Sequence, residues 1–463
     1  MEAFSFESFL NFGIFVYVCL FICFSVVTIV LSSIEISRYK RKNRYETFKP
    51  LLVSPFAPSV SVIVPVINLR TSIVDTVRGL LALQYNNFDI IVVIEGNSDL
   101  HLIELTKFYQ LQSAGYSALT HIKSQEINGC YRSANPVFSK LTVVDKASGG
   151  RADALNAGIN ISKSDLVLCV DPDCFLDQDS LLKLVKPFLE EREQVISASS
   201  VVHLANSSEK KDGHLLKLKF PKNILAAFQA IEYWKIFVIK RMAWSNINGI
   251  PLFSGTVNLF NREVLIESGA YNSEALSPDF ELLIRMGRYM HDNAKRYKVA
   301  CIAEPICRID VPESLQILSR ERRTWNGGVL QALRLHKNLV LNFKYGKLGL
   351  LNVPVCMLSL CIPYFIILLL ILIVAGAFLS NINLEFAGVL LFTGYFFSVL
   401  MSVITVLYEE SSFRSYTSGR DIIKMLLLGF VEPVIYQPMV LYWQITSAFG
   451  KRIKQTYLKS DLL

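Results

Sequence analysis

Two aspartates, one residue apart, directly follow a short apolar run. The run is Leu166–Val170, and Asp171 and Asp173 come after it with a proline between them. Because the proline ends a strand and permits a turn, both carboxylates can face one cation. Oxygen ligands suit Mg²⁺ or Mn²⁺, which often bridge a carboxylate to phosphate oxygens. The pattern predicts a divalent-cation site, while a polar surface turn remains an alternative reading of the same residues.

A glycine pair followed by an arginine forms a second candidate site. Within residues 148–158, Gly149 and Gly150 stand before Arg151 at an expected helix start. Backbone amides in such a turn can approach phosphates, and Arg151 adds a positive charge. A tight strand-to-helix turn without a ligand fits these residues equally well.

Asp279 lies in the first turn of the helix expected over residues 277–290. An acid there usually interacts with the positive end of the helix. Asp279 becomes a candidate general base only if it shares a pocket with Asp171 and Asp173.

Trp325 lies in an arginine-rich stretch that includes Arg322 and Arg323. An indole ring suits the apolar face of a sugar, and arginine suits phosphate. An aromatic residue at a membrane surface, with basic neighbours that contact lipid, is the alternative.

The segments that would position these residues alternate between strand and helix patterns. Strands are expected over 59–67, 88–96, 141–144 and 166–170, helices over 71–83 and 98–111, and a strand leading to a helix over 253–265. This alternation predicts a parallel sheet with helices on its faces, and such sheets bind ligands beyond the carboxyl ends of their strands. Residues 112–136 and 205–213 are polar and are expected to be loops.

Apolar segments flank this domain. Of the 463 residues 52% are hydrophobic, and residues 11–34, 348–384 and 386–408 contain no charge. The first segment is long enough to span a bilayer and is expected to be a retained helix rather than a cleaved signal. Basic residues follow it at Arg38, Lys40, Arg41, Lys42 and Arg44, which predicts a cytoplasmic domain.

The last apolar segment, residues 425–450, contains one charge, Glu432, and basic residues follow it. A re-entrant or surface-lying segment and a full span both fit this pattern. The net charge of +8 is concentrated in membrane flanks, so we expect contact with anionic lipid and no nucleic-acid binding. The nine cysteines are scattered without a CxxC pair, which argues against a metal-thiolate site.

In their order along the chain, these motifs resemble the membrane-bound family 2 glycosyltransferases, the class of cellulose, hyaluronan and poly-N-acetylglucosamine synthases. The resemblance covers residues 59–325. Its most specific blocks are GGRADALNAG (149–158) and LVLCVDPDCFLDQDSL (166–181), and FQAIEYWKIFVIKR (228–241), FSGTVNLFNREVL (253–265) and DFELLIRM (279–286) follow.

The resemblance implies an α/β fold: a cytoplasmic GT-A domain with a Rossmann-like, mostly parallel sheet, plus an α-helical transmembrane region. The implied division is an N-terminal transmembrane helix with its basic flank (1–45), the GT-A domain (50–311), an amphipathic interfacial region (312–346) and a C-terminal transmembrane region (347–463).

The resemblance also implies residue roles. Asp279 would be the general base, and Asp173 would ligate Mg²⁺ or Mn²⁺ on the diphosphate. The nucleotide-sugar would contact Glu95, Arg151, Asp153, Asp171, Arg322 and Arg323. The acceptor would contact Phe253, Ser254, Gly255, Thr256 and Trp325.

The implied activity is that of an inverting hexosyltransferase, which transfers a sugar from a UDP-sugar to a surface or extracellular polysaccharide and forms a β-linkage. The implied setting is the inner (plasma) membrane as a multi-pass protein, with a UDP-sugar donor, a glycan acceptor, membrane lipid and subunits of a polysaccharide export system as partners. Four positions depart from the family pattern: Glu95, Pro278, Glu321 and Thr324. They leave open an alternative, a catalytically degenerate scaffold or sensor in a polysaccharide machine.

Overall fold

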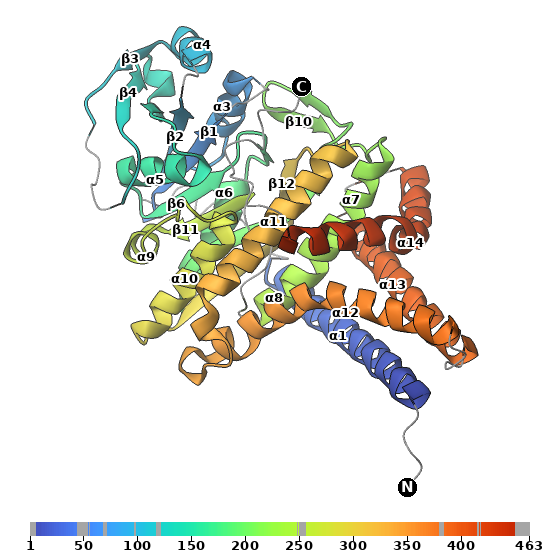
Figure 1. The fold of residues 1–463 in the computed structure, drawn as a ribbon. Coiled ribbons are helices and arrows are strands. Elements are labelled where there is room, and N and C mark those ends of the chain that lie inside the picture. The colour runs from blue at the N-terminus through green and yellow to red at the C-terminus, as the bar shows by residue number, and fades with distance from the viewer. Residues whose placement is uncertain are drawn as a thin grey trace.

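The computed structural model describes residues 6–43, 54, 56–67, 72–96, 99–116, 122–247, 249, 256–378, 384–413, 416 and 418–449. Figure 1 shows a central sheet with helices around it and long helices extending to one side. The helices of the sheet domain are α3 (Ile73–Leu81), α4 (Asp99–Tyr109), α5 (Arg151–Ile161), α6 (Ser180–Glu190), α7 (Ile224–Trp234), α8 (Met242–Asn246), α9 (Arg262–Glu267), α10 (Pro278–Asp292) and α11 (Leu315–Leu335).

The described strands form a ten-stranded mixed sheet in the order β3-β4-β5-β2-β1-β6-β11-β8-β12-β7, with a separate β9–β10 hairpin. Their bounds are β1 Val60–Val66, β2 Phe88–Glu95, β3 Leu111–Ser113, β4 Ile127–Ser133, β5 Leu141–Lys146, β6 Leu166–Val170, β7 Phe175–Leu176, β8 Gln194–Leu204, β9 Glu209–Lys211, β10 His214–Lys217, β11 Val257–Asn261 and β12 Tyr297–Ile309. The run β5-β2-β1-β6 is parallel. β11 is antiparallel to both of its neighbours. The predicted α/β class is confirmed, with parallel strands at the centre of the sheet.

Both faces of the parallel strands are covered, which explains their nearly continuous apolar sequence. Val62 and Val64 lie in a core shared with α3, α6 and α7. Ile63, between them on β1, points to the other face and lies in a core with α5 and α10. Asp171 therefore follows β6 at the carboxyl end of a fully buried strand.

Two loop predictions were wrong in part. Residues 112–136 include β4, which pairs antiparallel with β5. β4 lies between β3 and β5, next to the edge of the sheet, and its residues are mostly exposed or half-buried, so an apolar pattern was absent. Residues 205–213 include β9, which pairs with β10. Ala205 and Asn206, at the start of the same segment, are buried.

Within the described residues, four helices are long and apolar enough to cross a membrane: Val18–Lys42, Leu348–Ala375, Ala387–Ser412 and Gly419–Ser447. They belong to α1 (Phe6–Asn43), η5 with α12 (Leu348–Asn352 and Val353–Phe378), α13 (Leu384–Ser412) and α14 (Gly419–Phe449). Figure 1 shows α1, α12 and α13 extending away from the sheet, and α14 packs against α7, α11 and α13. These helices indicate a membrane protein.

Candidate active site

Arg151 joins Asp171 and Asp279, two acids that sequence analysis required to lie close together if Asp279 is to act as a base. Its Nε donates to Asp171 Oδ1 over 2.7 Å, and its Nη1 donates to Asp279 Oδ2 over 2.8 Å. Asp171 follows β6, Asp279 begins α10, and Arg151 begins α5. Three segments far apart in the sequence therefore meet at one charged centre, where Asp171 and Asp279 contact the same arginine.

The Asp279 carboxylate is buried and held on both oxygens. Its second oxygen, Oδ1, accepts a hydrogen bond from the Tyr271 hydroxyl over 3.0 Å. Tyr271 is itself fixed, because its backbone N–H and C=O both bond to the Asn156 side chain. Burial raises the pKa of Asp279, while the charge of Arg151 opposes this and favours the carboxylate. The arrangement suits a base whose protonation is controlled by its neighbours.

Glu95 fixes the glycine turn that precedes Arg151. Its Oε1 accepts hydrogen bonds from the backbone amides of Gly149 and Gly150. Gly150 has a φ of 89°, which a residue with a side chain rarely adopts. The amides that the sequence suggested for phosphate therefore already donate to a carboxylate, and the turn sets the start of α5.

Asp153 is buried beneath the same turn. It pairs with the fully buried Lys146 at 2.5 Å and accepts a hydrogen bond from the Gln125 backbone over 2.9 Å. Removing either member alone would leave an unpaired buried charge and destabilise the turn.

Asp173 lies on a tight turn, in which Cys174 N–H donates to the Asp171 carbonyl over 3.1 Å. The Thr76 hydroxyl holds the turn through the Pro172 carbonyl at 2.8 Å. Burial raises the pKa of Tyr233 on α7, and Asp173 contributes to this among other charges. The two aspartates thus have different neighbours: Asp171 contacts Arg151, and Asp173 lies near Tyr233 of α7.

Only part of the predicted acceptor segment lies within the described residues. Thr256 precedes β11, and its carbonyl lies 3.8 Å from Cys174 Sγ, next to the aspartate turn. Phe253, Ser254 and Gly255 lie outside the described residues.

Helix α11 lies directly against the helix that carries Asp279. A Cβ on Gly328 would lie 2.6 Å from the Ser277 Cβ, so the glycine permits this close approach. One turn further on, Gln331 accepts a hydrogen bond from the Leu276 backbone over 2.8 Å. Trp325 and Asp279 thus belong to two helices in direct contact.

The two predicted arginines of α11 differ in their contacts. Arg322 is buried and donates to Glu232 Oε2 over 2.7 Å, and its guanidinium lies 4.6 Å from the centre of the Trp325 ring. Arg323 makes no ion pair with any described residue, and its buried Nε has no hydrogen-bond partner among them. The buried Nε of Arg322 also lacks a partner there, so the difference between the two arginines is the pair that Arg322 forms with Glu232.

Comparison with known proteins now identifies the domain. Residues 61–269 match the model of glycosyl transferase family 2. This region is a family 2 glycosyltransferase domain.

Two bacterial relatives are poly-beta-1,6-N-acetyl-D-glucosamine synthases. The one from Staphylococcus aureus (strain COL) is 24% identical over 261 residues, 56% of this chain and 52% of the relative. The one from Staphylococcus epidermidis is 21% identical over 406 residues, 86% and 84% of the two chains. The match thus spans about half the length of the Staphylococcus aureus relative.

Two solved structures are also similar. A mannosyltransferase from Pyrobaculum calidifontis in complex with GDP-Man and Mn²⁺ has a TM-score of 0.47 at 14% identity, covering 92% of this chain and 97% of that one. Glucosyl-3-phosphoglycerate synthase from Mycobacterium tuberculosis with Mg²⁺ and UDP has a TM-score of 0.37 at 15% identity, covering 62% and 83%.

The acid turn of this family 2 glycosyltransferase domain offers few protein ligands to a cation. No group of three or more His, Cys, Asp or Glu residues that could hold a metal ion occurs in the part of the chain described. Mg²⁺ commonly binds through one or two carboxylates plus substrate phosphates and water. The oxygen donor of Asp173 fits a cation that arrives with a diphosphate.

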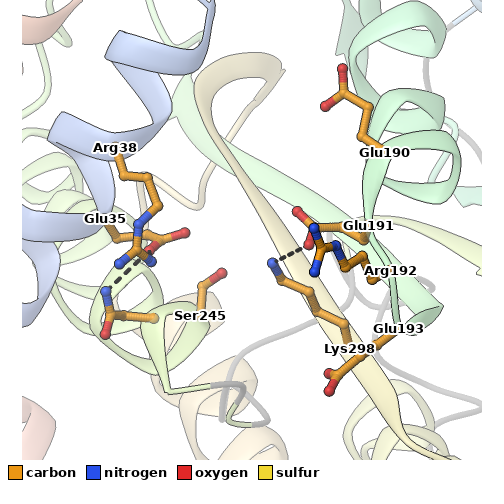
Figure 2. A pocket seen from close by; sticks show the side chains of 9 residues that line it. Glu35, Arg38, Glu190, Glu191, Arg192, Glu193, Ser245 and Lys298 are labelled. Atoms are coloured by element: carbon orange, nitrogen blue, oxygen red, sulfur yellow. Dashed lines mark hydrogen bonds and ion pairs between the residues drawn. The ribbon is translucent and has the colours of Figure 1, made fainter.

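A charged cavity lies elsewhere, between α1 and the edge of the glycosyltransferase domain. It has a volume of about 410 Å³ and is lined by Glu35, Arg38, Glu190, Glu191, Arg192, Glu193, Ser245, Asn246 and Lys298. Figure 2 shows Lys298 paired with Glu191, at 2.8 Å. None of the predicted site residues lines this cavity, so it is separate from the candidate active site.

Sequence reasoning missed three side chains that hold the site together: Tyr271, Glu232 and Tyr436. Tyr271 and Glu232 fall within or beside the family motifs, in SGAY and FQAIEYW. Their bonds to Asp279 and Arg322 depend on the packing of α7, α10 and α11, which no local pattern reports.

Proposed function

We propose that this chain is an inverting glycosyltransferase that transfers a sugar from a UDP-sugar to a growing surface or extracellular polysaccharide, forming a β-linkage. The observation that carries the proposal is the contact of Arg151 with both Asp171 and Asp279, through which the proposed donor side and the proposed base would share one site. The names of the bacterial relatives make UDP-N-acetylglucosamine the first donor to test.

In the proposed reaction, Asp279 takes the proton from an acceptor hydroxyl. The hydroxyl oxygen then attacks the anomeric carbon of the donor sugar, and the bond from that carbon to the diphosphate breaks. UDP leaves with the electron pair. One displacement inverts the anomeric centre, so an α-linked donor gives a β-linked product.

The chain's own residues would prepare this step. Arg151 would hold Asp279 ionised until the donor binds, since a diphosphate competes for the same guanidinium. Asp173 would hold the Mg²⁺ or Mn²⁺, which would stabilise charge on the leaving diphosphate. Arg323 would contact the diphosphate, Glu95 and Asp153 would support the turn beside the nucleotide, and Thr256 and Trp325 would line the acceptor.

The proposed setting is the inner membrane. The basic residues that follow the first apolar segment favour a cytoplasmic glycosyltransferase domain, with residues 50–311 as its extent. A polysaccharide made there must cross the membrane, so subunits of an export system are proposed partners.

The test is UDP release by the purified full chain with UDP-N-acetylglucosamine and a panel of other UDP-sugars, with and without Mn²⁺. Asp279→Asn removes the base, and general-base catalysis contributes roughly 10²- to 10⁴-fold, so a loss of that size is expected. Binding of UDP should change little. Asp292→Asn is the matched control, because Asp292 lies at the other end of α10 in a surface pair with Lys344.

Full turnover by Asp279→Asn would overturn the base assignment. The degenerate-scaffold alternative rests on the four departures from the family pattern. It predicts no Mn²⁺-dependent UDP release by the wild-type chain with any partner, and release would exclude it.

A further inference from the structure

Helix α14 is held against the glycosyltransferase domain by two charged contacts about one helical turn apart. Lys235, in the π-helix η2 (Lys235–Arg241) that continues α7, donates to Glu432 over 2.7 Å. Glu232, at the end of α7, accepts a hydrogen bond from the Tyr436 hydroxyl over 2.6 Å. Glu432 and Tyr436 are fully buried. The charge that the sequence left unexplained in the last apolar segment is therefore a docking contact.

The two contacts differ in the further partners of each carboxylate. Glu432 also receives hydrogen bonds from Ser402 of α13 and from Gln437 of α14 itself, so its further partners lie on helices of the membrane region. Glu232 instead receives Arg322 of α11, with the Arg322 Nη2 at 2.7 Å from the same oxygen that Tyr436 contacts. Glu232 thus connects α14 to α11, the helix that carries Trp325.

Arg322 lies near two aromatic rings, those of Trp325 and Tyr233. Its guanidinium carbon is 4.6 Å from the centre of the Trp325 ring and 5.9 Å from that of Tyr233. Burial alone would lower the pKa of Arg322, but the surrounding acidic groups, Glu232 first among them, together outweigh it and raise that pKa. An arginine with its charge satisfied and its plane beside an indole keeps that ring in one orientation.

Aromatic and apolar side chains pack around the contact between Glu232 and Tyr436. Phe228 of α7 stacks on Tyr436 with ring centres 5.6 Å apart and planes 18° apart. Leu318, one turn before Arg322 on α11, lies in the same buried cluster with Tyr436 and Trp443. A shift of α14 would therefore be transmitted to Arg322 through both the carboxylate and the apolar contacts.

We infer that Glu232 is a positioning residue for the acceptor: held by Tyr436 of α14, it fixes Arg322, and Arg322 fixes the Trp325 ring. The inference rests on the proposed function in one respect, the stacking of a sugar acceptor on Trp325. It follows that docking of α14 sets the affinity for the acceptor and leaves the affinity for the donor unchanged.

The experiment compares Glu232→Gln with Glu432→Gln in the full chain. Both changes keep the side-chain shape and leave one cation, Arg322 or Lys235, without its carboxylate, so each removes one of the two contacts that dock α14. Only the first acts on Arg322. Binding of a β-1,6-linked N-acetylglucosamine oligosaccharide is measured by calorimetry in an Asp279→Asn background, which needs no turnover, and UDP binding is measured in the same samples.

We expect Glu232→Gln to weaken oligosaccharide binding roughly tenfold, as loss of a charge-assisted hydrogen bond does, with UDP binding unchanged. Glu432→Gln should leave oligosaccharide binding within about twofold. Tyr436→Phe, which keeps the Glu232–Arg322 pair, should fall between the two. In the active enzyme, Glu232→Gln should raise the KM for the acceptor and leave the KM for the donor unchanged.

Equal weakening by both glutamine variants would show a purely structural role and overturn the inference. Weakened UDP binding would assign Arg322 to the donor, and absence of oligosaccharide binding in the parent chain would also overturn it. Oligosaccharide binding without UDP release from the wild-type chain would refute the proposed function and leave the inference standing.

Discussion

Replacing Arg151 with glutamine should move the pH dependence of the reaction. Asp279 acts as a base only when ionised, and its pKa is raised by burial and held down by Arg151. Removing the guanidinium leaves Asp279 beside the Asp171 carboxylate, which further favours the protonated form. The acid limb of the rate profile should therefore move to higher pH in Arg151→Gln, with activity recovering as the pH rises.

The geometry gives the size of this effect. Charges centred about 4 Å apart interact by about 4 kcal/mol at the effective dielectric constant of a protein site. Arg151 shares its charge between Asp171 and Asp279, at 2.7 and 2.8 Å, so we assign about half of that energy to Asp279. About 2 kcal/mol corresponds to a roughly 30-fold larger loss of rate at the acid end of the profile than at its plateau.

The assay is the initial rate of UDP release from pH 5 to 9, analysed as kcat/KM for the acceptor at saturating donor. Arg151→Lys, which keeps a positive charge, is the matched control and should shift the limb much less. A uniform fall in rate across the pH range, with the acid limb unmoved, would refute the claim that Arg151 sets the protonation of Asp279.

Two further predictions concern α11. Gly328→Ala should destabilise the chain by about 1–3 kcal/mol in thermal unfolding, because the new Cβ would lie 2.6 Å from the Cβ of Ser277. Gly327→Ala is the control and should be nearly neutral, because its Cβ meets the nearest atom only at 4.0 Å. Equal melting temperatures of the two variants would contradict the packing argument. Arg323→Met should weaken UDP binding by about 1.5–3 kcal/mol, since its buried Nε lacks a partner among the described residues. An unchanged UDP affinity would remove Arg323 from the donor site.

Much of the fold was predictable because the parallel strands are buried on both faces. Their runs of β-branched residues need no partner to be recognised, and the acids after β6 and at the start of α10 stand where such sheets bind ligands. Strand β4 was not predictable in this way. Its residues are mostly polar and show no apolar face, and only pairing with β3 and β5 makes it a strand.

The contacts between site residues were beyond a sequence reading. Arg151 was expected beside the nucleotide, and its bond to Asp279 joins residues 128 positions apart. Glu232 looks like any polar residue of a helix, yet it bonds to residues 90 and 204 positions away. Arg322 and Arg323 are adjacent in sequence, and only the position of α7 shows that the first is paired and the second is not.

The departures from the family pattern favour an active enzyme over a degenerate one. Pro278, in place of the usual glutamate, stands in the first turn of α10, where a missing N–H costs nothing, and Asp279 keeps its bonds to Arg151 and Tyr271. Thr324, in place of arginine, is buried one turn before Gly328, where α10 and α11 approach closely and a short side chain suits. Glu95 keeps a carboxylate that holds the glycine turn. These three departures therefore leave Asp279 buried and paired with Arg151, as its proposed role as the base requires.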